Sequence, residues 1–379
     1  MSTENGKFLI PSYFGLACVW FGTHCGPGTA SGKQTAVYFL QYGKWSLIFP
    51  FVAMGFLGLG VYYAIEFSRR VQATNFKDFA NKLFHPYENF FANFFEFTFL
   101  ATVGMSGGAC MATGSLLFNQ YFGVPVWVGA ALMAIVTIVF SIYGAEIVRV
   151  SSSYMSIIIF GSMIVLVAIG ISHSGGLSHS LSQSTFSEAS AGTALWKSIV
   201  YAAFQCTGVI GVTVAVSDGL KSKEDSKKAT AWGIIINALF LVVIAIMLMG
   251  YPEAVTNNLP NYYVLTKVGV PILTVLYVAI VYLACVTNTI AFSHALSGRY
   301  SKYFKMKNER NIKLIICIMM LVYVSAVSGF GLDAIVRTGF SYLGYIALGT
   351  LLIPTILVGS RKLKKMDAAL AEEAAHEVY

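Results

Sequence analysis

Glycines and a proline gather near the start of the chain. The cluster comprises Gly22, Gly26, Pro27, Gly28 and Gly32. Pro27 lacks an N–H and clashes with the preceding turn, so this segment cannot form an uninterrupted helix. Broken backbone exposes free N–H groups, which attract anions, and free C=O groups, which attract cations. We therefore expect Gly26, Gly28 and Thr29 to offer N–H groups to a substrate, with Trp20 covering its apolar part.

A similar stretch occurs in the second half of the chain. Gly208 lies 182 residues after Gly26, and its neighbours are polar or aromatic. We expect a second interruption here, with the facing wall of the site formed by Phe204, Gln205, Thr207 and Gly208. Two alternatives stay open: glycine in a membrane helix also marks close packing, and Trp20 and Phe204 can be ordinary core or lipid-facing aromatics.

Three ionisable side chains fall within apolar segments, where such residues are functional candidates. Glu96 can carry a proton, and His24 can titrate near neutral pH. Lys33, at the end of the glycine cluster, can replace a coupling cation or gate the pocket. All three are therefore candidates for proton coupling.

The composition of the chain sets its class. Of 379 residues, 56% are hydrophobic and 11% are charged, whereas soluble domains carry about 25% charged residues. This excludes a soluble enzyme, a nucleic-acid-binding protein and a secreted disulfide scaffold. Because the apolar runs are long and do not alternate, an outer-membrane barrel is also excluded. The sequence predicts an all-α integral membrane protein.

Uncharged windows long enough to cross a bilayer, which takes roughly 20 helical residues, predict ten transmembrane helices. They run over 8–32, 45–65, two within 97–145, 154–172, 198–217, 232–252, 268–298, 314–332 and 338–360. We expect a single transmembrane domain over residues 1–360, followed by a tail over 361–379 that forms a short cytoplasmic helix at the membrane surface.

The basic residues predict the orientation, because positively charged loops stay cytoplasmic. With the N-terminus inside, 20 of the 25 Lys and Arg residues lie in inner segments and 5 in outer ones. Both termini are then cytoplasmic, in the inner (plasma) membrane. The net charge of +8 therefore reflects membrane topology and does not indicate a nucleic-acid partner.

The two halves of the chain match each other. The 182-residue offset brings five predicted helices onto the other five, as repeats over about 8–172 and 193–360. Five is odd, so the second repeat is inverted in the membrane. Inverted repeats with glycine-interrupted first helices indicate a transport site at the bilayer midplane.

The motif Gly26-Pro27-Gly28-Thr29-Ala30-Ser31-Gly32, followed by Tyr38-Phe39-Leu40, resembles the first-helix signature of YkvI-type bacterial membrane proteins. They form a branch of the amino acid–polyamine–organocation superfamily. The resemblance implies a LeuT-like fold of two inverted five-helix repeats, with helices 1 and 6 broken. The sequence departs from the signature at Lys33-Gln34, where an acidic residue is common, and at His24-Cys25, which replace aliphatic residues.

The resemblance also implies a sodium site between the broken first helix and the eighth helix. Carried over to this chain, it would use the carbonyl groups of Gly22, Cys25 and Ala284 with the side chains of Thr287 and Asn288. Sodium prefers five or six oxygen ligands, which these groups can supply. The alternative is that the threonine hydroxyl bonds back to its own helix.

We expect an ion-coupled secondary active transporter that works by alternating access on an amino acid or similar small polar solute. Sodium is slightly favoured over protons as the coupling ion, and no cofactor is expected. No H-E-x-x-H or nucleotide-binding motif occurs, so an enzyme is not expected. Import or export and the oligomeric state stay undetermined.

Two alternatives remain. A non-transporting receptor of the same fold would carry the same features. A transition-metal transporter would use soft ligands, and five such residues fall in spans around the predicted site: His24, Cys25, Cys110, Cys206 and Cys285. Against a metal site, the sequence has no C-x-x-C or H-x-x-x-H spacing and no aspartate in the broken segment.

Overall fold

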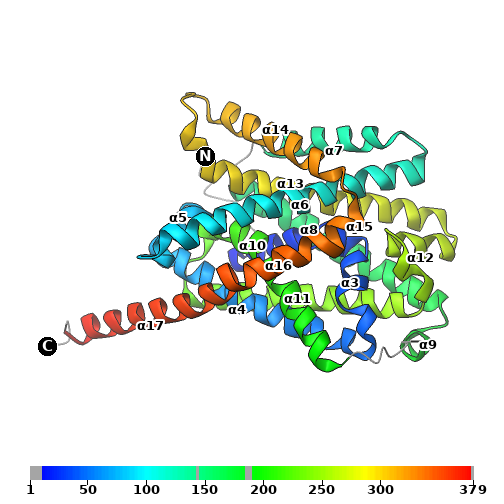
Figure 1. The fold of residues 1–379 in the computed structure, drawn as a ribbon, viewed down its shortest axis with the longest axis horizontal. Helices are drawn as coiled ribbons and strands as arrows, with labels where there is room; N and C mark the ends of the chain where they lie inside the picture. The colour runs from blue at the N-terminus through cyan, green and yellow to red at the C-terminus, as the bar shows by residue number, and fades with distance from the viewer. Residues whose placement is uncertain (1–10, 142–144, 184–189, 377–379) are drawn as a thin grey trace.

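The computed structural model describes residues 11–141, 145–183 and 190–376, and every regular element within them is helical. The long helices run side by side in an elongated bundle, and α17 (Ile353–His376) projects beyond one end (Figure 1). The predicted start of the first span, Phe8, lies outside the described residues. The all-α prediction is confirmed for the part of the chain that is described.

Within these ranges, eight helices are long and apolar enough to cross a membrane. Seven of them are α4 (Phe49–Val71), α6 (Glu88–Phe122), α8 (Ala145–His173), α10 (Ala191–Ala215), α11 (Lys223–Met249), α13 (Pro271–Tyr300) and α14 (Glu309–Ser328). The eighth joins α15 (Leu332–Ala334), α16 (Phe340–Ala347) and α17 through π-helical turns at Ile335–Gly339 and Leu348–Leu352. The shorter apolar helix α7 (Val126–Ser141) and a broken first segment complete the ten predicted spans.

Proline and glycine fix several helix ends. Pro50 and Pro271 lie in the first turns of α4 and α13. N–H groups in the first turn have no hydrogen-bond acceptor within the helix, so a proline there costs no hydrogen bond. Gly123 has φ +67° and ends α6. Glycine adopts this left-handed conformation without the steric strain that a Cβ would cause. The predicted turn between the third and fourth spans is thereby confirmed.

The contacts between helices follow the twofold pattern of an inverted repeat. The second span packs on the sixth (α4 on α10), and the seventh packs on the first (α11 on α1, Ser12–His24). Likewise the third span packs on the tenth (α6 on α16), and the eighth on the fifth (α13 on α8). When the two five-helix halves are exchanged, the contact between the second and sixth spans becomes that between the seventh and first. In the same way, the contact between the third and tenth spans becomes that between the eighth and fifth.

Two groups of helices stand out in this packing. The first, second, sixth and seventh spans contact one another, as α1, α4, α10 and α11. The third, fourth, eighth and ninth spans do the same, as α6, α7, α13 and α14. α1 touches both groups, because it also packs against α8 and α13. The broken segment therefore lies where the two groups meet.

The predicted interruption of the sixth span is wrong. α10 is one continuous α-helix over Ala191–Ala215. This stretch contains no proline, and its glycines serve close packing instead. A Cβ on Gly211 would lie 2.2 Å from the ring of Phe99 in α6, and one on Gly208 would lie 3.4 Å from Thr102 of the same helix. Small residues that let helices approach need no break.

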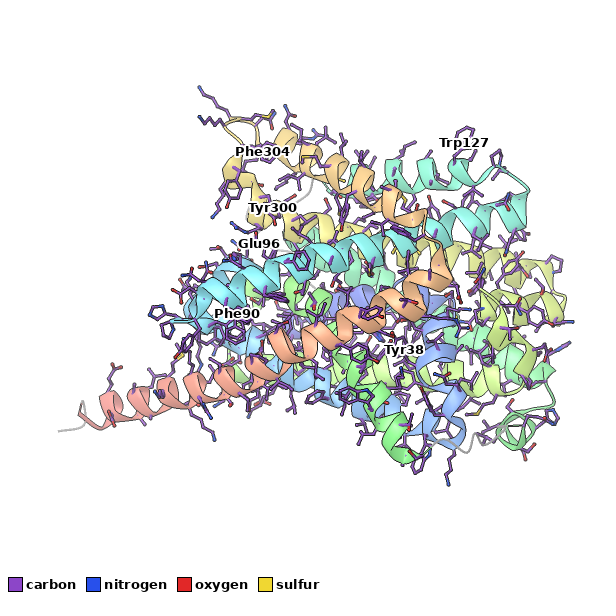
Figure 2. All side chains as sticks on the ribbon, in the orientation of Figure 1. Tyr38, Phe90, Glu96, Trp127, Tyr300 and Phe304 are labelled. Atoms are coloured by element: carbon purple, nitrogen blue, oxygen red, sulfur yellow. The ribbon has the colours of Figure 1, made fainter. Side chains whose placement is uncertain are left out.

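We call one end of the bundle the basic end: α4, α10 and α13 end there, and α5 (Phe76–Phe84) lies there. The opposite end carries α9 (Leu177–Ser182) and α12 (Pro260–Val268). Figure 2 shows exposed Phe90 towards the basic end and Trp127 towards the opposite end, 57% and 70% exposed. Aromatic side chains at both ends are typical of the two membrane interfaces.

The tail forms no separate helix. We predicted a short helix from Arg361, but α17 runs without interruption from Ile353 to His376. It is anchored at the basic end, where Asp367 pairs with Arg70 of α4 at 2.5 Å and with Lys223 of α11 at 2.7 Å. The tenth span and the tail therefore form one continuous element.

Candidate substrate and ion site

The first span is broken, as predicted. α1 ends at His24, one turn of helix follows as α2 (Pro27–Ala30), and α3 (Lys33–Tyr38) begins after Gly32, whose φ is +83°. Gly26 is extended, with ψ −165°. Because α2 is a single turn, its dipole is small. The N–H groups at the start of α2 therefore contribute less to the polarity of the break than the sequence predicted.

Neighbouring elements satisfy the carbonyl groups that the break sets free. Asn288 of α13 donates its Nδ2 to the Thr23 carbonyl at 2.6 Å. Asn261 of α12 and Tyr277 of α13 both donate to the Ala30 carbonyl, at 3.0 and 3.3 Å. Irregular backbone at membrane depth is tolerated only when it is buried in protein or lines a cavity. These contacts hold the broken segment in its irregular conformation.

A network of polar side chains centres on Gln34 of α3. Its Oε1 accepts from Tyr201 Oη at 3.0 Å and from Gln205 Nε2 at 3.1 Å, both on α10. Thr29 Oγ1 lies 2.7 Å from the same oxygen and 2.9 Å from the His24 carbonyl, so its single proton is shared between two acceptors. Each of these side chains is at most 6% exposed.

His24 joins the network through Tyr201. Its Nε2 lies 2.7 Å from Tyr201 Oη. The Tyr201 hydroxyl has one proton, which it donates to Gln34 when His24 Nε2 is protonated and to His24 Nε2 in the other tautomer. Nδ1 is buried and has no hydrogen-bond partner in the described part of the chain. Such an orphan costs about 1–3 kcal/mol and marks a place for a ligand or water.

Aromatic rings line the neighbouring wall. Tyr38 lies 5.1 Å from Tyr201 and 6.4 Å from Phe204 between ring centroids, and Phe204 stacks on Phe340 of α16 at 4.2 Å. Figure 2 marks Tyr38 on α3, whose hydroxyl lies 3.1 Å from Ser341 Oγ of α16. A polar network beside stacked rings suits a solute with one polar and one apolar end.

The predicted substrate residues divide into two sets. Gly26, Gly28, Thr29 and Gln205 line the break or the network, and Phe204 belongs to the aromatic wall. The remaining three lie elsewhere or stay unpaired. Gly208 faces Thr102 and Phe292. Trp20 packs on α11, where a Cβ on Gly233 would lie 2.1 Å from its ring. Thr207 is buried, and its hydroxyl has no partner among the described residues.

The predicted ion residues come together between α1 and α13. A Cβ on Gly26 would lie 2.7 Å from Asn288 Nδ2, and one on Gly22 would lie 2.9 Å from Thr287 Cγ2. Thr287 Oγ1 donates to the Leu283 carbonyl of its own helix at 2.8 Å, as the alternative expected. A hydroxyl that donates in this way keeps its lone pairs for a cation.

Two further oxygens bear on this site. Asn288 Oδ1 is buried and has no partner in the described ranges. Ser156 of α8, which the sequence analysis did not single out, donates to the Cys18 carbonyl at 2.8 Å, and its Oγ lies 3.6 Å from a Cβ placed on Gly22. Cys25 and Ala284, whose carbonyls complete the predicted set, are fully buried.

Lys33 is fully buried at the end of the break where α3 begins. Its Nζ lies 2.8 Å from Asp333 Oδ1 of α15 and donates to the Asn257 carbonyl at 2.9 Å. The pair links the first span to the tenth.

Glu96 lies far from the break, at the basic end. It pairs with Arg299 of α13 at 2.7 Å and with Lys77 of α5 at 3.1 Å, and Tyr300 donates to it at 2.9 Å. Figure 2 shows Glu96 and Tyr300 between α6 and α13. They border a cavity of about 570 Å³ that Leu100, Met319 and other apolar side chains line. A carboxylate held by two cations is poorly suited to carry a proton.

The soft-ligand residues do not form a metal site. No group of three or more His, Cys, Asp or Glu side chains that could hold a metal ion occurs among the described residues, which include all five candidates. His24 Nε2 is already engaged by Tyr201. The donors of the broken segment are amides, hydroxyls and carbonyls, which suit hard cations.

Sequence reasoning missed Gln34 and Tyr201 as site residues. Gln34 was noted only as a departure from the family signature. Tyr201 stands four residues before Gln205, so the two share a helix face. That spacing was a usable signal for Tyr201. Nothing in the sequence predicts that Gln34 contacts Tyr201, which lies 167 positions later in the chain.

No protein-family profile matches the chain. It is similar to the uncharacterized membrane protein YkvI of Bacillus subtilis, with 22% identity over 336 residues that span 88% of this chain and 92% of the relative. It is also 22% identical over 308 residues to the uncharacterized protein YyaD of the same organism, covering 80% of this chain and 86% of YyaD. The resemblance to YkvI drawn from the first-helix motif is confirmed.

Solved transporter structures share the fold. A Na⁺-coupled sialic acid symporter superimposes with a TM-score of 0.68 at 14% identity, covering 93% of this chain and 90% of its own. MhsT in complex with L-phenylalanine gives 0.64 at 14% identity, covering 94% and 89%. A manganese transporter of Eremococcus coleocola gives 0.57 at 13% identity, covering 93% and 80%. The chain is thus a multi-pass membrane protein with a LeuT-like fold.

Proposed function

We propose that this protein is an ion-coupled secondary active transporter for an amino acid or a similar small polar organic solute. One observation carries the proposal: the broken first span is buried where two helix groups meet, and side chains from both groups bind it. Similar discontinuous helices form the sites of transporters built from inverted repeats. The symporter neighbours support the same function.

Alternating access would follow from the two helix groups. The group of α1, α4, α10 and α11 would rock against the group of α6, α7, α13 and α14, around the break. The Lys33–Asp333 pair would close the opposite end. At the basic end, Asp367 would hold α17 to Arg70 and Lys223. Both termini would be cytoplasmic, as the distribution of basic residues predicts.

Sodium is the coupling ion we favour. Asn288 Oδ1 is unpaired in the described structure, and the Thr287 hydroxyl, which donates to the Leu283 carbonyl, keeps its lone pairs. A proton remains the second candidate because His24 lies in the network with an unpaired Nδ1. Glu96 fits proton coupling less well, since two cations hold its carboxylate.

A transition-metal transporter is the alternative that the manganese-transporter neighbour raises. The donor set around the break argues against it for this chain, because the described residues contain no group of three or more His, Cys, Asp or Glu side chains that could hold a metal ion. A non-transporting receptor would have the same site, and uptake measurements separate it from a transporter.

The proposal is tested by thermal unfolding of the purified protein with amino acids, amines, nucleobases and divalent metals, each with and without Na⁺. A ligand that binds the folded state raises the unfolding temperature with its saturation. We expect an amino acid or similar solute to do so, and Na⁺ to enlarge the shift. Stabilisation by a divalent metal alone would favour the alternative.

A further inference from the structure

Three hydrogen-bond donors converge on one buried oxygen atom, Oε1 of Gln34. They are Thr29 Oγ1 at 2.7 Å, Tyr201 Oη at 3.0 Å and Gln205 Nε2 at 3.1 Å. A carbonyl oxygen has two lone pairs, whereas a carboxylate offers about four acceptor positions over two oxygens. A carboxylate would therefore offer these three donors more acceptor positions than the amide oxygen, which shares the proton of Thr29 with the His24 carbonyl.

The Gln34 side chain also covers the broken segment. A Cβ on Gly28 would lie 2.6 Å from both Cγ and Nε2 of Gln34. The side chain thus fills the space that the glycine leaves open, and it is 3% exposed. It reaches this position from α3, which begins directly after left-handed Gly32. Gln34 lies between the break and α10, where a solute in contact with both would lie.

The groups around this oxygen are neutral hydrogen-bond donors, which suit a bound anion. In the described part of the chain, the bonds to Gln34 Oε1 come from hydroxyl and amide groups, and no Asp or Glu side chain contributes. The adjacent Lys33 is already paired with Asp333. A buried anion is tolerated only if it is well hydrogen-bonded, and bonds to a carboxylate are roughly twice as strong as neutral ones.

We propose that Gln34 is a tethered occupant of the substrate site, which a carboxylate group of the transported solute displaces. The amide of Gln34 takes the donors of Thr29, Tyr201 and Gln205 while the site holds no solute. The carboxylate takes them when the solute binds, and Gln34 swings away from Gly28. This inference rests on the proposed function and narrows its substrate class to solutes with a carboxylate.

Two substitutions of Gln34 should change affinity in opposite directions. Gln34→Ala removes the tethered competitor, so carboxylate solutes should bind about tenfold more tightly. This change in affinity corresponds to the free energy of about one net hydrogen bond. Gln34→Glu places a permanent carboxylate among the three donors, so the same solutes should bind at least about a hundredfold more weakly. Gln120→Ala and Gln120→Glu, at an exposed position near the end of α6, are the matched controls and should change nothing.

The probes are the standard L-amino acids and, for each, the amine that lacks the carboxylate. Dissociation constants are measured by calorimetry on purified full-length protein. We expect wild type to bind the acid and not the amine, Gln34→Ala to bind the acid more tightly, and Gln34→Glu to lose it. Equal binding of acid and amine, or unchanged affinity in Gln34→Ala, would overturn the inference. So would the absence of binding in both wild type and Gln34→Ala.

The inference and the proposed function can fail separately. The expected binding pattern without gradient-driven uptake would support the role of Gln34 and contradict transport. Gradient-driven uptake of a solute that has no carboxylate would support transport and overturn the role of Gln34.

Discussion

At the scale of single residues, the account depends on atoms that the break leaves available. Thr287 and Asn288 lie against Gly22 and Gly26, and these glycines leave no Cβ in the way. A side chain at Gly26 would meet the Asn288 amide at 2.7 Å. The glycines therefore allow the close approach of α1 and α13 on which a shared ion site depends.

Thr287→Ala should weaken sodium binding. The change removes the Thr287 hydroxyl, a proposed ligand of the ion, and we expect the half-saturating Na⁺ concentration to rise about tenfold, as for loss of one good polar contact. Thr289→Ala is the matched control, because the Thr289 hydroxyl contacts only Cys285, Val286 and Thr137 in the described structure. The readout is the Na⁺ dependence of the ligand-induced thermal shift. An unchanged dependence in Thr287→Ala would remove Thr287 from the ion site.

Gly28→Val should abolish ligand binding while the protein still inserts and folds. The added side chain would fill the space beside the break that Gln34 occupies, 2.6 Å from the position of a Cβ, and that the solute would take in its place. Gly55→Val on α4 is the control, since a Cβ there meets nothing within 4 Å. Calorimetry on monodisperse protein measures the effect. Normal affinity in Gly28→Val would show that the solute does not bind at the break.

At the scale of elements, the first span was predictable and the sixth was not. Pro27 removes a helical N–H and clashes with the preceding turn, and four glycines surround it within eleven residues, so the break in the first span follows from local sequence. Gly208 and Gly211 permit either an interruption or close packing. In the structure they pack against Thr102 and Phe99 of α6. Because α6 is distant in the sequence, the residues around these glycines could not predict close packing over an interruption.

The Lys33–Asp333 pair should act as the closure at the end opposite the basic end. Asp333→Asn leaves the buried Lys33 ammonium without its carboxylate, and an unpaired buried charge is strongly unfavourable. We expect this end to open, so that Cys25, fully buried at the break, is labelled several-fold faster by a membrane-impermeant thiol reagent added to intact cells.

Two variants control this labelling experiment. Asp367→Asn breaks the ion pairs of α17 at the basic end, which faces the cytoplasm in our proposal, and should not accelerate labelling from outside. Cys25→Ala should remove the labelled product. Equal labelling of Asp333→Asn and wild type would exclude the pair as a closure.

At the scale of the whole molecule, the shortage of charge identified the class, and the spacing of apolar windows identified ten spans. The site is less accessible to sequence reasoning, because its central contacts join distant segments. Gln34 and Tyr201 are 167 positions apart, and Thr23 and Asn288 are 265 apart. Only the inverted arrangement of the two halves brings them together.

The orientation is a prediction for the whole chain. With 20 of 25 basic residues in the proposed inner segments, the C-terminus should be cytoplasmic. A C-terminal green fluorescent protein fusion should therefore fluoresce, and a C-terminal alkaline phosphatase fusion should be inactive. An active phosphatase fusion would place the basic end outside and reverse the assignment of both closures.

Gradient-driven uptake tests the central claim most directly. Purified protein is reconstituted in liposomes, and accumulation of a radiolabelled ligand from the thermal-shift screen is followed with an inward Na⁺ gradient, with an inward proton gradient and with no gradient. We predict accumulation above equilibrium with the Na⁺ gradient, its collapse with a sodium ionophore, and none with Gly28→Val. Saturable binding without accumulation under any gradient would contradict transport and indicate a receptor.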